Sequence, residues 1–169
     1  MIHRYRKNDA AQLVGVIREA NAVVAKQFDI TLDNNPKHPS FYTEEWLAKD
    51  IARGEQYFVA HVSRMNSEAE DELGCVAACV AFEHPRPDTA YLNRLSVLPQ
   101  YQQQGIGRAL VEYVIDYAKS QNITFISIGI IASHTVLKEW YMRLGFVEGE
   151  TKVIDHLPFD VAYLRLTLS

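Results

Sequence analysis

Cysteine, tryptophan and methionine are scarce in this chain of 169 residues, which carries two, two and three of them respectively. The two cysteines, Cys75 and Cys79, stand four residues apart in an apolar stretch. Even spacing along a strand places them on one face, about 13 Å apart, which is too far for a disulfide between them. We expect two small buried side chains, and nothing in the sequence indicates an oxidising compartment.

An excess of positive charge is also absent, since the formal net charge is −4. This balance gives no electrostatic footprint for nucleic acid, and it is compatible with a cationic substrate such as an amine. No apolar run is long enough to span a bilayer, and residues 1–6 lack the hydrophobic region of a signal peptide. We therefore expect a cytoplasmic protein with neither a nucleic-acid nor a membrane partner.

Three familiar ligand-binding motifs are missing or incomplete. No G-x-x-x-x-G-K-[ST] is present, which excludes a P-loop lysine. Gly105 and Gly107 are not followed by a third glycine three residues later, so the dinucleotide fingerprint is incomplete. The six histidines form no H-E-x-x-H motif and the cysteines no C-x-x-C motif, so the spacing gives no support for a metal site.

The strongest local signal that is present lies in residues 95–110, LSVLPQYQQQGIGRAL. Apolar and polar residues alternate as in a strand until Pro99, which has no N–H to continue a ladder. A helical spacing of apolar residues begins at Ile106. Gly105 and Gly107 let the backbone turn sharply and let a ligand approach, and the first helical amides are unpartnered at the positive end of the helix dipole. The stretch indicates either a phosphate or pyrophosphate site or an ordinary strand-to-helix turn.

Strands and helices alternate along the rest of the chain. Alternating apolar residues predict strands over 2–6, 56–63, 73–82, 89–98, 124–131, 146–151 and 160–168, whereas spacings of three and four predict helices that begin near Asp9, Thr43, Gly107 and Ser133 and end near Val24, Gly54, Gln121 and Gly145. Residues 28–41, 64–71 and 83–88 are expected to be loops or turns. The order predicts an α/β fold with a central mixed sheet, in one domain over residues 1–169.

The expected fourth strand has an interrupted pattern. Leu92 and Arg94 share one parity, whereas Leu95 and Val97 share the other. A strand of fixed period cannot bury Leu92 together with both later apolar residues on one face. A β-bulge near Asn93 or Arg94, or burial of both faces, would each account for this pattern.

Two separated motifs resemble those of the GCN5-related N-acetyltransferase (GNAT) family. The Q-x-x-G-x-G of residues 102–107 resembles the family's [Gln/Arg]-x-x-Gly-x-[Gly/Ala] loop, which binds the pyrophosphate of coenzyme A. The Y-x-x-x-G-F of residues 141–146 resembles the family's late Tyr-x-x-x-Gly-Phe motif, and the L-x-V-x-P of residues 95–99 is similar to its fourth strand. The resemblance runs from about residue 89 to residue 148.

The resemblance implies a GNAT-type acyl-CoA N-acyltransferase fold, in which helices flank a mixed, mostly antiparallel sheet. The fourth strand of this fold is bulged and splays from the fifth to admit the pantetheine arm. The implied activity is transfer of acetyl from acetyl-CoA to a primary amine of a small molecule or peptide, by direct attack and without a metal. The alternative is a non-catalytic module that binds or senses acyl-CoA, and the lack of a carboxylate on the expected fourth strand favours it.

The resemblance also implies which residues bind coenzyme A and which perform the chemistry. Tyr141 is the implied general acid, because a phenol is protonated at neutral pH and can donate to a departing thiolate. His134 stands where the family commonly has an asparagine that contacts the cofactor. The expected coenzyme A site comprises Leu95, Ser96, Val97, Gln102, Gln103, Gln104, Gly105, Ile106, Gly107, Arg108, Ala109 and His134.

The residue that removes the amine proton is less clearly marked. Glu83 and its neighbour His84 are the nearest candidates by sequence, with waters and backbone carbonyls as the alternative route. Arg94 is expected to lie on a solvated face rather than to bind an acidic substrate group. Residues 28–41 and 83–88 are expected to border the acceptor site, and an exposed last strand could pair across a homodimer.

Overall fold

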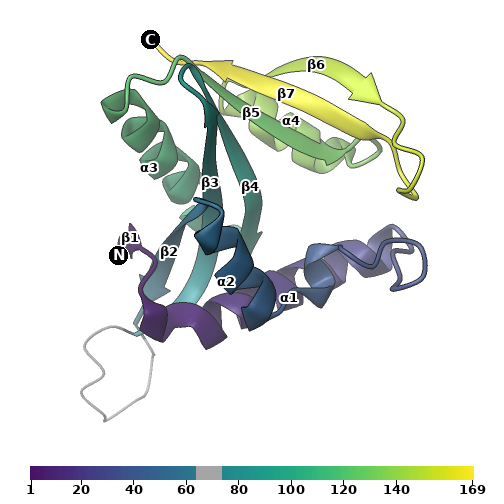
Figure 1. The fold of residues 1–169 in the computed structure, drawn as a ribbon, viewed down its shortest axis with the longest axis horizontal. Coiled ribbons are helices and arrows are strands. Elements are labelled where there is room, and N and C mark those ends of the chain that lie inside the picture. The colour runs from purple at the N-terminus through teal and green to yellow at the C-terminus, as the bar shows by residue number, and fades with distance from the viewer. Residues whose placement is uncertain (64–73) are drawn as a thin grey trace.

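The computed structural model describes residues 1–63 and 74–169, so the predicted hairpin tip at 64–71 lies outside the described residues. Its elements, in chain order, are β1 (Ile2–Arg4), η1 (Lys7–Asp9), α1 (Ala10–Gln27), η2 (Pro39–Phe41), α2 (Glu44–Ala52), β2 (Gln56–Val62), β3 (Cys75–Arg86), β4 (Thr89–Val97), η3 (Pro99–Tyr101), α3 (Ile106–Ser120), β5 (Phe125–Ile131), α4 (Thr135–Arg143), β6 (Val147–Lys152) and β7 (Val161–Thr167) (Figure 1). The predicted alternation of strands and helices is confirmed, with small shifts at the ends.

The strands form one seven-stranded sheet in the order β1-β2-β3-β4-β5-β7-β6. Every neighbouring pair is antiparallel except β4 and β5, which are parallel and are connected through α3. A parallel pair needs such a crossover, because its strands start at the same edge of the sheet. The predicted mixed, mostly antiparallel sheet is therefore confirmed.

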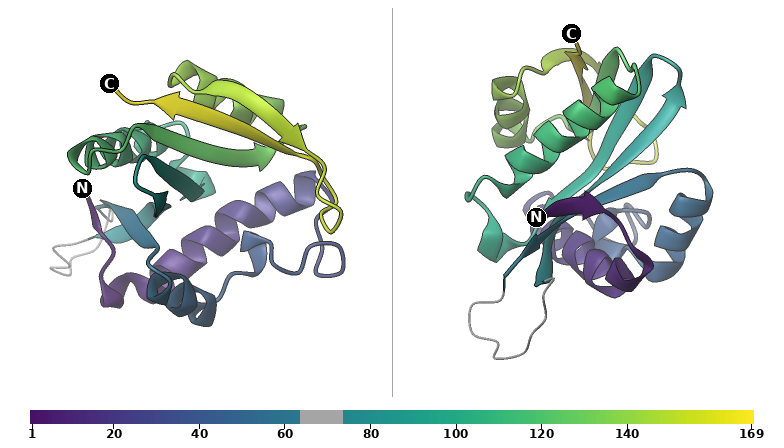
Figure 2. Two further views of the ribbon diagram at one scale, coloured as in Figure 1. Left: turned by 45° about the horizontal axis from the view of Figure 1, so that its top comes forward. Right: turned by 90° about the vertical axis from the view of Figure 1, so that its left-hand side faces the viewer.

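Helices cover both faces of the sheet (Figure 2). On one face, α1 and α2 pack on β2 and β3 around Leu13, Ile17 and Leu47. On the other face, α3 and α4 pack on β3 to β7 around Leu110 and Tyr141. No helix in the described part of the chain is long and apolar enough to cross a membrane.

The fourth and fifth strands pair at one end only. Their register joins Thr89 to Phe125 and ends at Tyr91 and Ser127, although both strands continue for several residues beyond that point. Figure 1 shows β4 and β5 diverging from this shared end. The predicted splay is confirmed, and it leaves one edge of β4 without a strand partner after Tyr91.

The interruption in the fourth strand is a β-bulge. Ala81 pairs with Asn93, but Cys79 pairs with Ser96, so β4 has one more residue than β3 between these two pairs. Arg94 lies inside this segment with a left-handed φ of 49°. Of the two accounts of the pattern, the bulge is the one that the structure confirms.

Three expectations about the strands are wrong. The last strand, β7, lies between β5 and β6, so it is not available at an edge for dimerisation. Most of the expected turn at 83–88 is strand, since β3 continues to Arg86. The two cysteines do not share a face of the sheet. Cys75 pairs with Val62 and Cys79 with Val59, and these valines point to opposite faces of β2. A register shift between the two pairs is the reason.

Candidate active site

The glycine-containing segment joins the end of β4 to the start of α3. After the 3₁₀ turn Pro99–Tyr101, Gln103 and Gly105 both adopt left-handed φ angles, of 61° and 82°. Gly105 is the N-cap of α3 and carries no capping side chain. A left-handed backbone strains any residue with a Cβ, so the turn requires glycine at position 105.

The amides of this loop lack an acceptor in the part of the chain that the structure describes. The first bond of α3 runs from the Ala109 amide to the Gly105 carbonyl, at 3.0 Å. Among the described residues, no acceptor is found for the amides of residues 103–108. Exposed N–H groups at the positive end of a helix are suited to a phosphate or diphosphate group, so this loop fits the pyrophosphate of coenzyme A.

Two glutamine side chains brace the loop from within. Gln102 donates through Nε2 to the Val97 carbonyl at 3.2 Å, and Gln104 donates to the Gln100 carbonyl at 3.3 Å. Arg108 is exposed and pairs with Glu112 through Nε at 2.8 Å, one turn further along α3. The side chains therefore hold the backbone in shape and leave its amides free.

Gly107 is the point at which the two sequence motifs meet. A Cβ at this position would lie 3.5 Å from Val97 Cγ2 and 3.7 Å from Trp140 Cζ2. The start of α3, the end of β4 and the middle of α4 are thus in close packing. Tyr141 follows Trp140 directly, so the fold brings the tyrosine motif to the glycine loop from more than thirty residues away.

Tyr141 is buried between aromatic rings. Its side chain is 4 % exposed and makes edge contacts with Trp140 and Phe146 at centroid distances of 4.9 and 5.4 Å. The left-handed Gly145, with φ 102°, ends α4 and returns Phe146 onto the same cluster. Burial raises the pKa of the Tyr141 phenol, so the group stays protonated above its ordinary range.

His134 lies at the opposite end of α4 from Trp140 and Tyr141. It is the N-cap of α4, six residues before Trp140, or about 9 Å along the helix axis. Its ring packs against Phe28 at 5.2 Å, and burial lowers its pKa, so the imidazole is neutral at pH 7. The structure thus places His134 with the loop that follows α1 and away from the glycine loop.

The bulge in β4 is held by a buried network that sequence reasoning missed. Arg94 is enclosed, with a side chain 20 % exposed, so the expectation of a solvated face is wrong. Its Nε donates to Tyr57 Oη at 2.7 Å, and its Nη2 pairs closely with Glu55, whose side chain is 1 % exposed. Burial acts to lower the pKa of the guanidinium, but Tyr57 and Glu55 outweigh it and raise that pKa.

The network extends to α2 and to β3. Tyr42 donates to Asp50 and shares a hydrogen bond with Tyr57 at 2.9 Å, and its ring lies 5.5 Å from the Arg94 guanidinium. Asn93 donates through Nδ2 both to Glu55 at 3.3 Å and to Glu83 at 3.2 Å. No spacing in the sequence marks this cluster, because its members come from α2, β2, β3 and β4.

Ser96 is turned into the same face of the sheet. Its hydroxyl donates to the Arg94 carbonyl at 3.0 Å and accepts from Asn21 of α1 at 3.1 Å. The side chain is buried, so only the backbone of Ser96 remains for a ligand. Leu95 and Val97, its neighbours on the open edge of β4, are partly buried on the α3 face.

The chain matches a known family over most of its length. The sequence pattern of the Acetyltransferase (GNAT) family matches residues 24–146. This range contains the glycine loop, the bulged β4 and the tyrosine motif. The chain belongs to the GNAT family. The matched region therefore includes every residue proposed from the two motifs.

Relatives of this GNAT chain have different substrates in their names. The [ribosomal protein bS18]-alanine N-acetyltransferase of Escherichia coli K12 is 38% identical over 61 residues, which is 36% of this chain and 41% of that protein. The N-acetylaspartate synthetase of Rattus norvegicus is 28% identical over 138 residues, which is 75% of this chain and 46% of that protein. The chain thus spans less than half of the length of these curated relatives.

Solved structures agree on the fold. The superposition with the ribosomal-protein-S18-alanine N-acetyltransferase of E. coli covers 100% of this GNAT chain and 94% of the E. coli chain, with a TM-score of 0.72 and 21% identity. Ard1 of Thermoplasma volcanium covers 100% of this chain and 97% of its own, with a TM-score of 0.74 and 14% identity. At these identities the likeness establishes the shared architecture.

Within this GNAT fold, the side chains of Glu83 and Tyr141 lie on opposite faces of the sheet. Glu83 shares the parity of Ala81, which packs against α1 and α2, whereas Tyr141 packs under α3 and α4. No contact among the described residues joins the two side chains directly. Residues 28–41 and the turn at Asp88 lie at opposite ends of β5, since Ile30 packs on Ile131 and Asp88 binds the amide of Phe125.

Proposed function

We propose that this protein transfers the acetyl group of acetyl-CoA to a primary amine. The observation that supports this most directly is the row of unpartnered amides from Gln103 to Arg108, set beside the open edge of β4. Membership of an acetyltransferase family supplies the reaction class. We place the protein in the cytoplasm, as a single domain over residues 1–169.

The protein's first task is to hold the thioester. The amides of residues 103–108 bind the pyrophosphate, and the free edge of β4 at Leu95 to Val97 takes the pantetheine arm in place of a strand partner. In the free protein the Val97 carbonyl accepts from Gln102. Ser96, Ile106 and Ala109 contribute through their backbone, and His134, at the far end of α4, is the remaining residue proposed to contact coenzyme A.

Its second task is to control two protons. The amine nitrogen forms a bond to the acetyl carbonyl carbon, the C–S bond breaks, and the departing sulfur takes the proton of Tyr141 Oη. Burial keeps that proton on Tyr141 until the thiolate forms. The proton that the new amide nitrogen then loses returns to Tyr141 through water, so the phenol is restored. Glu83, held by Asn93 on the other face, accepts a proton from the incoming ammonium. The acceptor therefore enters from the α1 and α2 side.

The acceptor is an amine on a small molecule or a peptide terminus. The names of the relatives suggest two probes, a peptide beginning with alanine and free aspartate. Residues 28–41 border the entry at the carboxyl end of β5, next to His134. A homodimer formed by strand pairing would use an edge strand, β1 or β6, because β7 is internal.

The test is steady-state release of free thiol from acetyl-CoA with a panel of amines that includes both probes. We expect turnover with at least one amine and binding of coenzyme A by calorimetry with none present. Binding without turnover across the panel would favour the alternative, a module that senses acyl-CoA. No heat of binding for coenzyme A or its thioester would contradict both proposals.

A further inference from the structure

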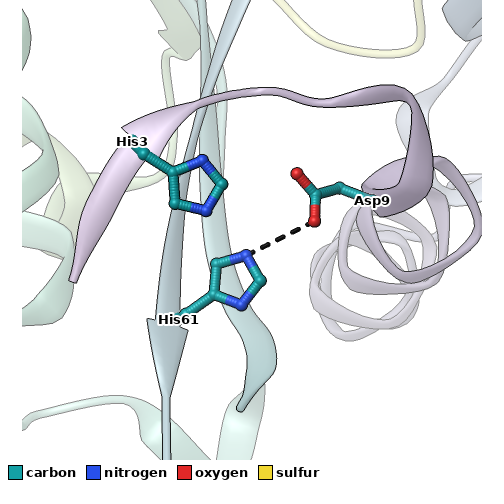
Figure 3. A group of neighbouring side chains, drawn as sticks. All are labelled: His3, Asp9 and His61. Carbon is teal, nitrogen blue, oxygen red and sulfur yellow. Dashed lines mark ion pairs between the residues drawn. The ribbon is translucent and has the colours of Figure 1, made fainter. Parts of the chain in front are cut away.

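Two histidines far apart in the sequence meet on the α1 face of the sheet. His3 of β1 pairs with Val59 of β2, and His61 lies two residues beyond Val59, so the histidines are diagonal neighbours on one face. Their rings stack at a centroid distance of 4.7 Å (Figure 3). Asp9, from the turn that opens α1, faces both rings. The three side chains belong to no part of the proposed acetyl-transfer site.

Three of the four imidazole nitrogens of this cluster are buried and make no hydrogen bond within the described residues. His61 is 8 % exposed, and neither Nδ1 nor Nε2 makes a hydrogen bond within the described part of the chain. His3 Nε2 is likewise buried and unpartnered. Leaving buried polar nitrogens without a partner destabilises the fold. Each neutral imidazole has one nitrogen with a lone pair, so a ligand that accepts one lone pair from each ring would partner two of these nitrogens, His3 Nε2 and His61 Nε2, while His61 Nδ1 carries the ring proton.

The neighbouring backbone fixes which atoms are free. His3 Nδ1 lies 2.7 Å from the Arg4 carbonyl, which can only accept, so Nδ1 carries the proton and Nε2 presents a lone pair. Asp9 Oδ2 accepts from the Arg6 amide at 3.0 Å, which leaves Oδ1 directed at His61. Both ligands are thus oriented by a second bond, as metal-ligating histidines and carboxylates usually are.

The Asp9 carboxylate is not bound by the helix that follows it. Asp9 with Gln12 resembles a capping box for α1, but the Asp9 side chain makes no cap hydrogen bond to that helix. The Gln12 side chain instead accepts from the Val76 amide at 2.9 Å. The Asp9 carboxylate therefore does not cap α1, and Oδ1 remains available to a ligand.

The distances are those of a compact metal site. His61 Nε2 lies 3.4 Å from Asp9 Oδ1, and one ligand atom from each of the three residues lies within 4.8 Å of the others. In a tetrahedral site with bonds of about 2.0–2.1 Å, ligand atoms are about 3.3–3.4 Å apart. The His61 and Asp9 pair has this separation, and a bound ion would draw the His3 nitrogen closer to complete the set.

We propose that His3, Asp9 and His61 bind a zinc-class divalent transition-metal ion, with a water as the fourth ligand. Two imidazoles and one carboxylate suit zinc, whereas calcium and magnesium prefer oxygen ligands alone. The ion would join the three-residue edge strand β1 to β2 and to the start of α1. Its role is to fix the N-terminal corner of the fold, separately from catalysis.

The test is zinc binding by the full chain after removal of any affinity tag and treatment with a chelator. We expect a stoichiometry of one by calorimetry, and cobalt should give the visible absorption of a tetrahedral nitrogen and oxygen site. Zinc at 100 times its dissociation constant should raise the midpoint of thermal unfolding by about 5–10 °C. No stoichiometric binding to the wild-type chain would overturn the proposal.

Variants locate the ion. Asp9→Asn retains an acceptor for the Arg6 amide but loses the charge, and His3→Gln removes one imidazole from a partly exposed strand. Each should weaken zinc binding at least about tenfold and, at the same zinc concentration, reduce the thermal shift to about half or less. His156→Gln, on an exposed residue far along the chain, is the matched control and should change neither. Equal zinc affinity in all three variants would place the ion elsewhere and overturn the assignment.

Discussion

The glycine loop and the Arg94 network both contain a non-glycine residue with a left-handed φ, but the polar groups around the two residues differ in their partners. Each contains a non-glycine residue in the left-handed region, Gln103 with φ 61° and Arg94 with φ 49°. Around Gln103 the backbone amides have no protein partner among the described residues. Around Arg94, Tyr57 and Glu55 bind the guanidinium, and the Ser96 hydroxyl donates to the backbone carbonyl. The amides around Gln103 remain available to a ligand, whereas the groups around Arg94 are bound by other residues of the protein.

The difference follows from where each segment lies. The loop is at the surface, where water satisfies free amides at little cost until a ligand replaces it. The bulge is buried under α2, where an unpaired charge or amide would be costly. Strained backbone in each place is therefore held by different forces, and single substitutions should separate the two.

The largest expected effect is on stability, from a substitution at Arg94 in the bulge of β4. Arg94→Ala leaves Glu55 buried without its main cation, and we expect a loss of about 3–5 kcal/mol of the free energy of unfolding. Urea unfolding measures the loss. The exposed pair on the loop side is the control, since Arg108→Ala should change stability by less than about 1 kcal/mol. Equal losses in the two variants would remove the distinction between the regions.

Next in size is the effect of Tyr141→Phe on turnover. Removal of a general acid should lower kcat at least about 100-fold, while calorimetric affinity for coenzyme A stays the same. Because burial raises the pKa of Tyr141, the acid form persists as pH increases, and wild-type kcat should show no loss through pH ~10. An unchanged kcat in the variant would exclude Tyr141 as the proton donor.

A smaller effect is expected on the affinity for coenzyme A, from a substitution in the glycine loop. Gly105→Ala adds a Cβ at φ 82°, which costs about 1–2 kcal/mol and should weaken binding of coenzyme A about tenfold. Gly54→Ala is the matched control, because Gly54 has φ 102° and equally open space around it. That variant should bind coenzyme A normally. Similar affinities for the two variants would mean that the loop does not bind the diphosphate.

The smallest effect concerns the two thiols on either side of the sheet. Cys79 is fully buried below the bulge, and burial raises its pKa to about 12, although Arg94 acts in the opposite direction. Cys75 is partly exposed. A thiol reagent should therefore modify one cysteine in the native protein and both after unfolding. Rapid modification of both in the native state would contradict the packing under β4.

The sequence predicted the parts of the fold that depend on local chemistry. Pro99 ends β4, Gly145 follows the end of α4 in a left-handed conformation, and Thr43 caps α2 through its hydroxyl. These features follow from the properties of single residues, so they can be read from a short window. The parity slip in β4 indicated either a bulge or burial of both faces for the same reason, but it did not indicate which residues would contact Arg94.

Long-range placement was out of reach of such windows. The parity argument put Cys75 and Cys79 on one face, but a register shift against β2 separated them. The sequence suggests an exposed last strand at the edge of the sheet, but β7 lies between β5 and β6. Spacing also gave no sign that His3 and His61 would meet, because the pairing of β1 with β2 decides it.

The helices, the strands and the glycine loop could be predicted from short stretches of sequence, since capping, turn formation and hydrophobic period are properties of neighbouring residues. The tyrosine motif was identified through its resemblance to the GNAT family. Only the tertiary structure decided that Gly107 packs beside Trp140, that Glu55 and Tyr57 enclose Arg94, and that His3, Asp9 and His61 share one corner. Such contacts join segments that are distant in the chain. They depend on strand order and register, which are set by the packing of the whole sheet.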